Sequence, residues 1–195
     1  MALSRERIAD ELLKLLALPD PAPTVRLMLG CNLFAPVVPE IENADRLGML
    51  IAAEREAAIP PDPLRRLAAL LPAEPAIAEK IAARLKLSNK ARKRLSSAAD
   101  IDLGKGPRPL AYRLGTEGAL DRLLLAARPA DASAIARWSP PRLPISGGDL
   151  IERGVPQGPE VARTLRLIEN AWEEAGFPKG EAFDRLVDAQ LPSRS

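Results

Sequence analysis

The chain has 195 residues, a length that corresponds to one large domain or two small ones. It contains 28 lysines and arginines, 26 aspartates and glutamates, one cysteine and no histidine, and its net charge is +2. Zinc sites, serine–histidine or cysteine–histidine nucleophile pairs and imidazole bases are excluded, because each needs residues that the chain lacks. A single cysteine also excludes an intrachain disulfide.

The sequence shows no signal for a membrane or for secretion. No apolar run approaches the roughly 18 residues that cross a bilayer, and the charged segment after Met1 is not followed by an apolar one. The free thiol of Cys31 suits a reducing compartment. We therefore expect a soluble, cytoplasmic protein with no membrane partner.

The composition predicts an all-α fold. Aromatic residues make up only 3% of the chain, and the prominent alanines, leucines, arginines and glutamates favour helices over strands. The 20 prolines, about twice the usual share, stand in groups where periodic segments stop. We expect about a dozen short helices in all, arranged as a compact body over residues 1–140 and a C-terminal helix hairpin over residues 141–195.

The first half of the chain contains the clearest helical patterns. Ser4 precedes an amphipathic segment whose apolar residues recur at helical spacing, namely Ile8, Leu12, Leu15 and Leu16. Residues 24–34 are apolar enough to be buried on most sides. A longer helix is predicted at 42–58, with Leu47, Leu50 and Ile51 facing inward.

Proline-bounded segments predict the helices that follow. Residues 63–71 and 75–87 indicate a helix pair joined by a proline turn, and Ser88 can cap a further helix at 89–99. A loop rich in glycine and proline comes next. Three more helices are predicted after it, at 110–114, 116–127 and 132–138.

The C-terminal part begins with Ser146 and Asp149, which have the spacing of a capping box. Pro159 follows Gly158 and suits the first position of a helix, which is predicted to run from 159 to 175 and to stop at Gly176. A last helix is predicted at about 180–190. We expect the tail, residues 192–195, to be frayed.

Basic residues are concentrated in the middle of the chain. Ten of them lie between Lys80 and Arg113, against only two aspartates, so this region carries +8 and the rest carries −6. On the helix predicted after Ser88, two lysines and an arginine share one side, and another arginine lies on the flank. The candidate nucleic-acid-binding residues of this region are Lys90, Arg92, Lys93, Arg94, Lys105, Arg108 and Arg113.

Such a stripe can bind phosphates, which gives an affinity that falls with salt and carries little sequence information. The alternative is a solvated helix face. Scarce, dispersed aromatic residues argue against a surface that stacks single-stranded bases. The helix N-terminus behind Gly158 is a further candidate site for a phosphate, and the alternative there is a plain helix hairpin whose glycines serve packing.

No residue of the chain is predicted to be catalytic. The carboxylate pairs Glu40/Glu42, Asp100/Asp102 and Glu173/Glu174 lie in polar stretches without a metal-binding signature. Asp100-Ile101-Asp102 is the only Asp-x-Asp motif, a pattern that metal-dependent nucleotidyl transfer can use. No Gly-Ser strand–helix segment precedes it, so we predict no metal site.

Four segments share a pattern with a known family. They are Ser4–Leu16, with Glu6-Arg7-Ile8 and Glu11-Leu12; 85–95; Tyr112–Gly115 together with 121–126; and 143–172. The last segment is the most specific, with Gly147, Asp149, Leu150, Gly154, Gly158, Pro159 and Trp172 all in register. Together they resemble the C-terminal helical region of the class II tRNA nucleotidyltransferase and poly(A) polymerase family, especially bacterial CCA-adding enzymes. The sequence departs from the family at Ala9 and Gly148, where arginine and lysine are common.

The resemblance implies that this chain is part of a larger enzyme. The family's catalytic head carries a Gly-Gly-x-Val-Arg-Asp-like loop and an Asp-x-Asp pair for magnesium, and its neck selects ATP or CTP through a Glu-Asp-x-x-Arg-like motif. Neither the loop nor the neck motif occurs here, and the one Asp-x-Asp, Asp100-Ile101-Asp102, lacks the Gly-Ser segment that would precede a magnesium pair. We expect the chain to bind the acceptor and TΨC arms of tRNA, or another RNA, to partner the missing N-terminal head of the same protein, and to be inactive alone, without a cofactor of its own.

Two other functions fit the same residues. One is a helical scaffold for protein interaction or dimerisation, in which the basic face serves solubility. The other is a helix-hairpin binder of duplex DNA that uses residues 146–163.

Overall fold

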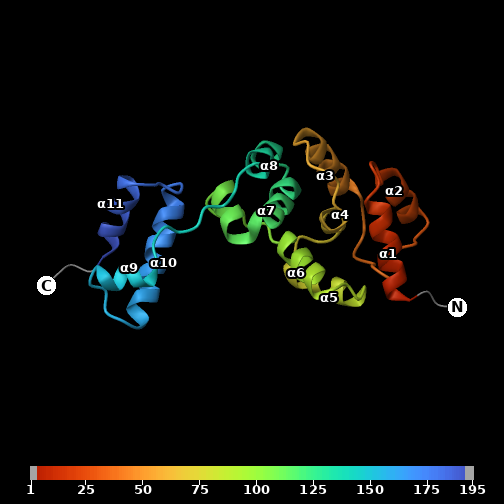
Figure 1. The fold of residues 1–195 in the computed structure, drawn as a ribbon. Coiled ribbons are helices and arrows are strands. Elements are labelled where there is room, and N and C mark those ends of the chain that lie inside the picture. The colour runs from red at the N-terminus through yellow and green to blue at the C-terminus, as the bar shows by residue number, and fades with distance from the viewer. Residues whose placement is uncertain (1–3, 192–195) are drawn as a thin grey trace. The chain divides into compact units, whose positions relative to one another are not determined.

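The computed structural model describes residues 4–191, which contain eleven α-helices and no strand (Figure 1). The all-α class predicted from composition is confirmed. The chain divides into two units, Met1–Trp138 and Ser139–Ser195, each with its own internal packing. The predicted fraying of residues 192–195 lies outside the described residues.

The N-terminal unit is built from eight helices whose ends follow simple local rules. Ser4 and Ser88 each accept a hydrogen bond from a backbone amide in the first turn of the helix that they cap, and the cap at Ser88 was predicted. Asp62 caps its helix in the same way. The helices are α1 (Arg5–Leu16), α2 (Ala22–Gly30), α3 (Asp45–Glu56), α4 (Pro63–Leu70), α5 (Pro75–Arg84), α6 (Asn89–Ala98), α7 (Pro107–Leu125) and α8 (Pro129–Ala136).

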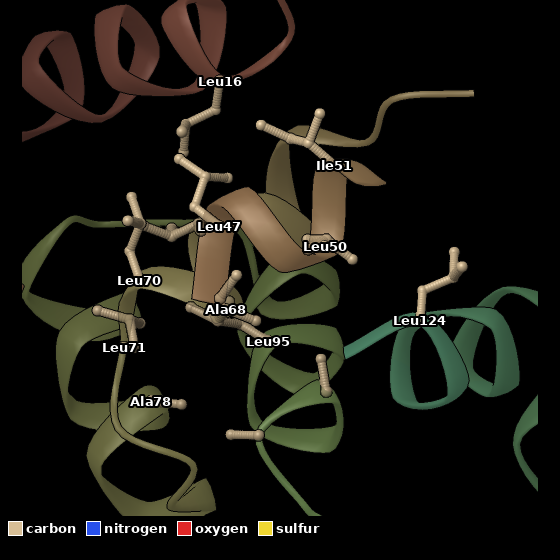
Figure 2. Packing of buried hydrophobic residues seen from close by; sticks show 14 of the residues in the cluster. Leu16, Leu47, Leu50, Ile51, Ala68, Leu70, Leu71, Ala78, Leu95 and Leu124 are labelled. Atoms are coloured by element: carbon tan, nitrogen blue, oxygen red, sulfur yellow. The ribbon is translucent and has the colours of Figure 1, made fainter. Parts of the chain in front are cut away.

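Helix α4 is the centre of this unit. It has only eight residues, but it packs against α1, α3, α6 and α7 and is buried along most of its length. The apolar cluster around it draws leucines from several helices, including Leu16 of α1, Leu47 of α3 and Leu95 of α6 (Figure 2). Burial of these side chains supplies the main favourable free energy of folding.

Helix α7 is interrupted at Gly115, where φ is 75° and ψ is 163°. This backbone conformation is open essentially to glycine alone. The two helices predicted at 110–114 and 116–127 are therefore two arms of one element with a kink between them. The kink separates the basic N-terminal arm, which buries Leu110 and Ala111, from the arm that carries Asp121.

The prediction that residues 24–34 are buried on most sides was wrong. Helix α2 ends at Gly30, and only its Ala22 and Val25 are buried. Leu27 is 68% exposed and Leu33 is 56% exposed. A short helix at the margin of the unit has one face to pack, so its remaining apolar side chains stay on the surface.

The C-terminal unit contains α9 (Gly147–Glu152), α10 (Pro159–Glu174) and α11 (Glu181–Gln190). Ser146 and Asp149 form both bonds of the predicted capping box. Trp172 of α10 is buried, makes edge contacts with Phe177 and Phe183, and donates its indole N–H to the Pro178 carbonyl at 2.8 Å. This small aromatic cluster holds α10 and α11 together.

Candidate nucleic-acid interface

Helices α5 and α6 form a hairpin that presents the densest basic segment of the chain. The hydroxyl of Ser96 donates to the Pro75 carbonyl at 3.1 Å, and the two helices pack along their length. Leu95 and Ala98 of α6 face the core. Since successive helical residues turn by about 100°, the positions opposite Leu95 and Ala98 face the solvent.

Lys90 and Lys93 occupy that outward face of α6. Both are exposed, and within residues 4–191 neither forms an ion pair. They are three residues apart, so they lie next to each other on the helix surface. We call this pair the α6 lysines.

The first turn of α6 adds to their positive field. It contains no acidic residue, and the whole helix has none. Its N-terminus carries the positive end of the helix dipole, where a lysine is less favourable than an acidic residue. An anion bound there would be attracted by the dipole and by Lys90 together.

Arg92 lies on the flank of α6, as predicted, and turns toward α5. Its Nη2 atom is 3.2 Å from a carboxylate oxygen of Glu79, and its side chain is about one-third exposed. Arg92 therefore helps to hold the hairpin together at the edge of the lysine face.

Arg94 lies on the opposite flank and points into the protein. Its side chain is 14% exposed and is held by three carboxylates. Nε lies 2.7 Å from Asp121, Nη2 lies 2.9 Å from Asp62, and Nη1 lies 3.0 Å from Glu117. Helical spacing along the sequence groups Arg94 with the lysines, but the fold turns its guanidinium toward internal partners.

The contact shifts the pKa values of Arg94 and Asp62 in the directions that favour their charged forms. Burial by itself would lower the pKa of Arg94, but the hydrogen bonds and charges of Asp121 and Asp62 outweigh burial and raise it. For Asp62, burial would raise the pKa, but the Arg65 amide and the Arg94 guanidinium lower it. Both shifts favour the charged forms of Arg94 and Asp62 at neutral pH.

Arg94 extends a buried ion cluster that the sequence analysis missed. Arg65 donates to Asp121 at 2.9 Å and to Glu54 at 2.8 Å, and Arg66 donates to the other oxygen of Glu54 at 2.9 Å. These four side chains are almost fully buried. A detectable signal was present: adjacent arginines inside the short apolar segment 63–70 need buried partners.

Two more cations of the basic region are paired with the first part of the chain. Arg84 makes two 2.8 Å hydrogen bonds to Glu40, and Lys86 lies 3.0 Å from Glu6. These contacts tie the hairpin to the segment around α1 and α2. They also reduce the positive charge that this region offers to a ligand.

The other predicted contacts are spread over a loop, a kinked helix and the second unit. Lys105 is exposed in the loop before α7, and Arg108 and Arg113 are exposed on its N-terminal arm. Gly158 is exposed in the C-terminal unit and precedes α10, with a φ of 115°. Glu160 in the first turn of α10 supplies negative charge there, so this helix end is a weaker anion site than that of α6.

Asp100 and Asp102 are occupied in local structure. Asp100 accepts from the Asp102 amide and pairs with Arg122 at 2.9 Å, and Asp102 accepts from the Gly104 amide. Within the described part of the chain, no group of three or more His, Cys, Asp or Glu side chains is arranged to hold a metal ion. Residues 4–191 also include no helix that is both long enough and apolar enough to span a bilayer.

An apolar groove of about 490 Å³ opens between α1, α2 and the turn that follows α2. Arg7 and Glu11 are its charged lining residues. The apolar lining residues are Ile8, Leu12, Leu15, Met28, Leu33, Phe34, Val37 and Val38.

Residues 1–45 match a family model described as the probable RNA and SrmB-binding site of polymerase A. This segment is similar to an RNA-binding region. It includes α1, α2 and the groove, and it ends at the first residue of α3. The match supports a poly(A) polymerase-like RNA-binding region and RNA as a partner. The comparison with curated proteins found no significant match.

Proposed function

We propose that this chain is the RNA-holding part of a poly(A) polymerase or CCA-adding tRNA nucleotidyltransferase, and that the α6 lysines bind the RNA backbone. The observation that carries the proposal is the unpaired, outward-facing Lys90 and Lys93 at the start of a helix without acidic residues. The match of residues 1–45 supports RNA as the ligand.

Recognition by charge and shape suits the surface of the protein. All six aromatic residues, Phe34, Tyr112, Trp138, Trp172, Phe177 and Phe183, are buried or half-buried. Base stacking needs exposed aromatic faces. Double-stranded RNA, by contrast, is recognised mainly through its phosphates, its 2′-hydroxyls and its A-form shape. We therefore favour a folded RNA with a double-stranded arm as the ligand.

The finer part of the proposal names tRNA. The resemblance to CCA-adding enzymes suggests the acceptor and TΨC arms as the bound region. In this proposal, magnesium and ATP or CTP belong to a catalytic head, and the present chain supplies affinity for RNA. Lys105, Arg108 and Arg113 would extend the contact from α6 along the loop and the first arm of α7.

The test is the salt dependence of binding to a tRNA transcript. Each lysine that neutralises a phosphate contributes about 0.9 to the slope of log affinity against log salt in a duplex. Lys90→Gln and Lys93→Gln should each reduce the magnitude of the slope by about that amount. Arg55→Gln is a suitable control, because Arg55 is an exposed cation on α3. Equal slopes for the parent chain and both lysine variants would refute the proposed contact.

A second candidate function rests on the apolar groove. The groove lies within residues 1–45, and the family model that matches this segment is described by a protein, SrmB, as well as by RNA. Leu33 in the lining of the groove is more than half exposed. We propose this groove as a protein-docking site, with SrmB as the partner to test. Leu33→Asp should weaken binding of purified SrmB, while Leu167→Asp on α10 should not. Unchanged binding by Leu33→Asp would exclude the groove.

A further inference from the structure

We propose that Arg94 is a positioning residue, which fixes the orientation of the α6 lysines toward RNA and does not bind phosphate itself. This inference rests on the proposed function of the α6 lysines. It divides the basic residues of α6 into two classes: lysines that contact the ligand and arginines that hold the helix in place.

The contacts of Arg94 leave little of its guanidinium for a ligand. Nε and Nη2 donate to the two oxygens of Asp121 at 2.7 and 2.9 Å. Nη2 also lies 2.9 Å from Asp62, and Nη1 lies 3.0 Å from Glu117. Each of the three guanidinium nitrogens therefore has a carboxylate partner.

Release of Arg94 toward a phosphate would be costly. Asp121 is 1% exposed, and among residues 4–191 it would keep only Arg65 as a charged partner. Removal of one partner from a buried charged group leaves charge that neither water nor protein compensates. Within the described part of the chain the two lysines have no such charged partners, so they can meet a phosphate without breaking an ion pair there.

The geometry also explains how Arg94 acts on the lysines. Arg94 joins α6 to Asp62 at the start of α4 and to Asp121 on α7. Arg92, two positions earlier and on the other flank, joins α6 to Glu79 on α5. Contacts on both flanks restrict rotation of α6 about its axis. That restriction keeps Lys90 and Lys93 on the outer face.

The experiment measures binding of the full chain to a tRNA transcript across a salt series for Arg94→Lys and Arg94→Gln. Lysine keeps the charge but lacks the planar fork that meets three carboxylates. A positioning role predicts that both variants lose affinity, by about fivefold or more, because fewer chains hold α6 in the binding orientation. The bound complex still contains both lysine contacts, so both variants keep the parent salt slope to within about 0.3. If Arg94 bound phosphate, Arg94→Lys would keep the affinity and Arg94→Gln would lower the slope.

Asp62→Asn provides a second test that preserves the fold. Asparagine is as good a helix cap as aspartate, so α4 keeps its N-cap while Arg94 loses one charged partner. A positioning role predicts an unchanged salt slope and weaker binding. A phosphate-binding Arg94 would be partly released by this change, which would raise affinity and steepen the slope. Glu56→Gln, an exposed carboxylate of α3, controls for the change in net charge.

The two proposals fail in different ways. Lys90→Gln with an unchanged slope contradicts the proposed function. A lower slope in both Lys90→Gln and Arg94→Gln leaves that function in place and overturns the positioning role. Circular dichroism shows whether each variant is folded. If the Arg94 variants are unfolded, the Asp62→Asn result decides between the two roles of Arg94.

Discussion

Asp121 on α7 accepts two hydrogen bonds from the guanidinium of Arg94 on α6, although its side chain is almost completely buried. Arg65 of α4 donates to the same carboxylate. Three helices therefore meet at one buried negative charge. This connection links the outward lysines of α6 to the most buried helix of the unit.

Removal of the Asp121 carboxylate should be strongly destabilising. Asp121→Ala leaves Arg65 and Arg94 without their shared partner, and loss of one member of a buried ion pair costs about 3–5 kcal/mol. Glu117→Ala removes a carboxylate that contacts the same guanidinium but is 59% exposed, so its cost should stay below about 1 kcal/mol. Urea unfolding of both variants measures the difference, and similar losses would contradict this account.

Acid should weaken the fold through Asp62. The pKa of Asp62 is lowered in the folded chain, because bonds from the Arg65 amide and the Arg94 guanidinium outweigh burial. A group with a lowered folded pKa adds stability above its ordinary value of 3.8, and that stability is lost as the pH falls through the folded value. The free energy of unfolding should thus drop below about pH 4.

In the Asp62→Asn variant, the free energy of unfolding should fall less at low pH than it does in the parent chain. The chain has no histidine, so stability should change little between about pH 5.5 and 7.5. Urea unfolding at several pH values tests both statements. Curves that are parallel for the two proteins at low pH would show that Asp62 does not contribute.

The kink in α7 predicts opposite effects for two glycine substitutions. Gly115→Ala should destabilise the chain by about 1–3 kcal/mol, because its backbone angles are unfavourable for any residue with a Cβ atom. A steric clash is not the cause, since a Cβ atom added at Gly115 would meet nothing within 4 Å. Gly48→Ala, in the helical backbone of α3, should stabilise the chain by about 0.5–1 kcal/mol. Thermal unfolding compares them, and a stable Gly115→Ala variant would contradict the kink.

Local signals in the sequence were enough to predict most of the helices. Ser88 as a cap predicted α6, the apolar spacing after Ser4 predicted α1, and Ser146 with Asp149 predicted the start of α9. Capping and periodicity depend on neighbours within one turn, so they are visible in a short segment. Burial of residues 24–34 depends on what the rest of the fold leaves for them to pack against, and there the prediction was wrong.

The site was only partly predictable for the same reason. Helical spacing grouped Lys90, Lys93 and Arg94 on one side, but it could not distinguish an outward lysine from an inward arginine. That distinction depends on Asp121, which lies 27 residues from Arg94 in the sequence and is brought to it by the fold. The contact of Lys90 and Lys93 with RNA stays a prediction.

The most direct measurement is the affinity of the full chain for a tRNA transcript after charge reversal at the two outward lysines. At low salt, the double variant Lys90→Glu/Lys93→Glu should bind about tenfold or more weakly than the parent, because two phosphate contacts become repulsive. Its circular dichroism should match that of the parent chain, since both side chains are exposed. Undiminished affinity in a folded double variant would contradict the central claim.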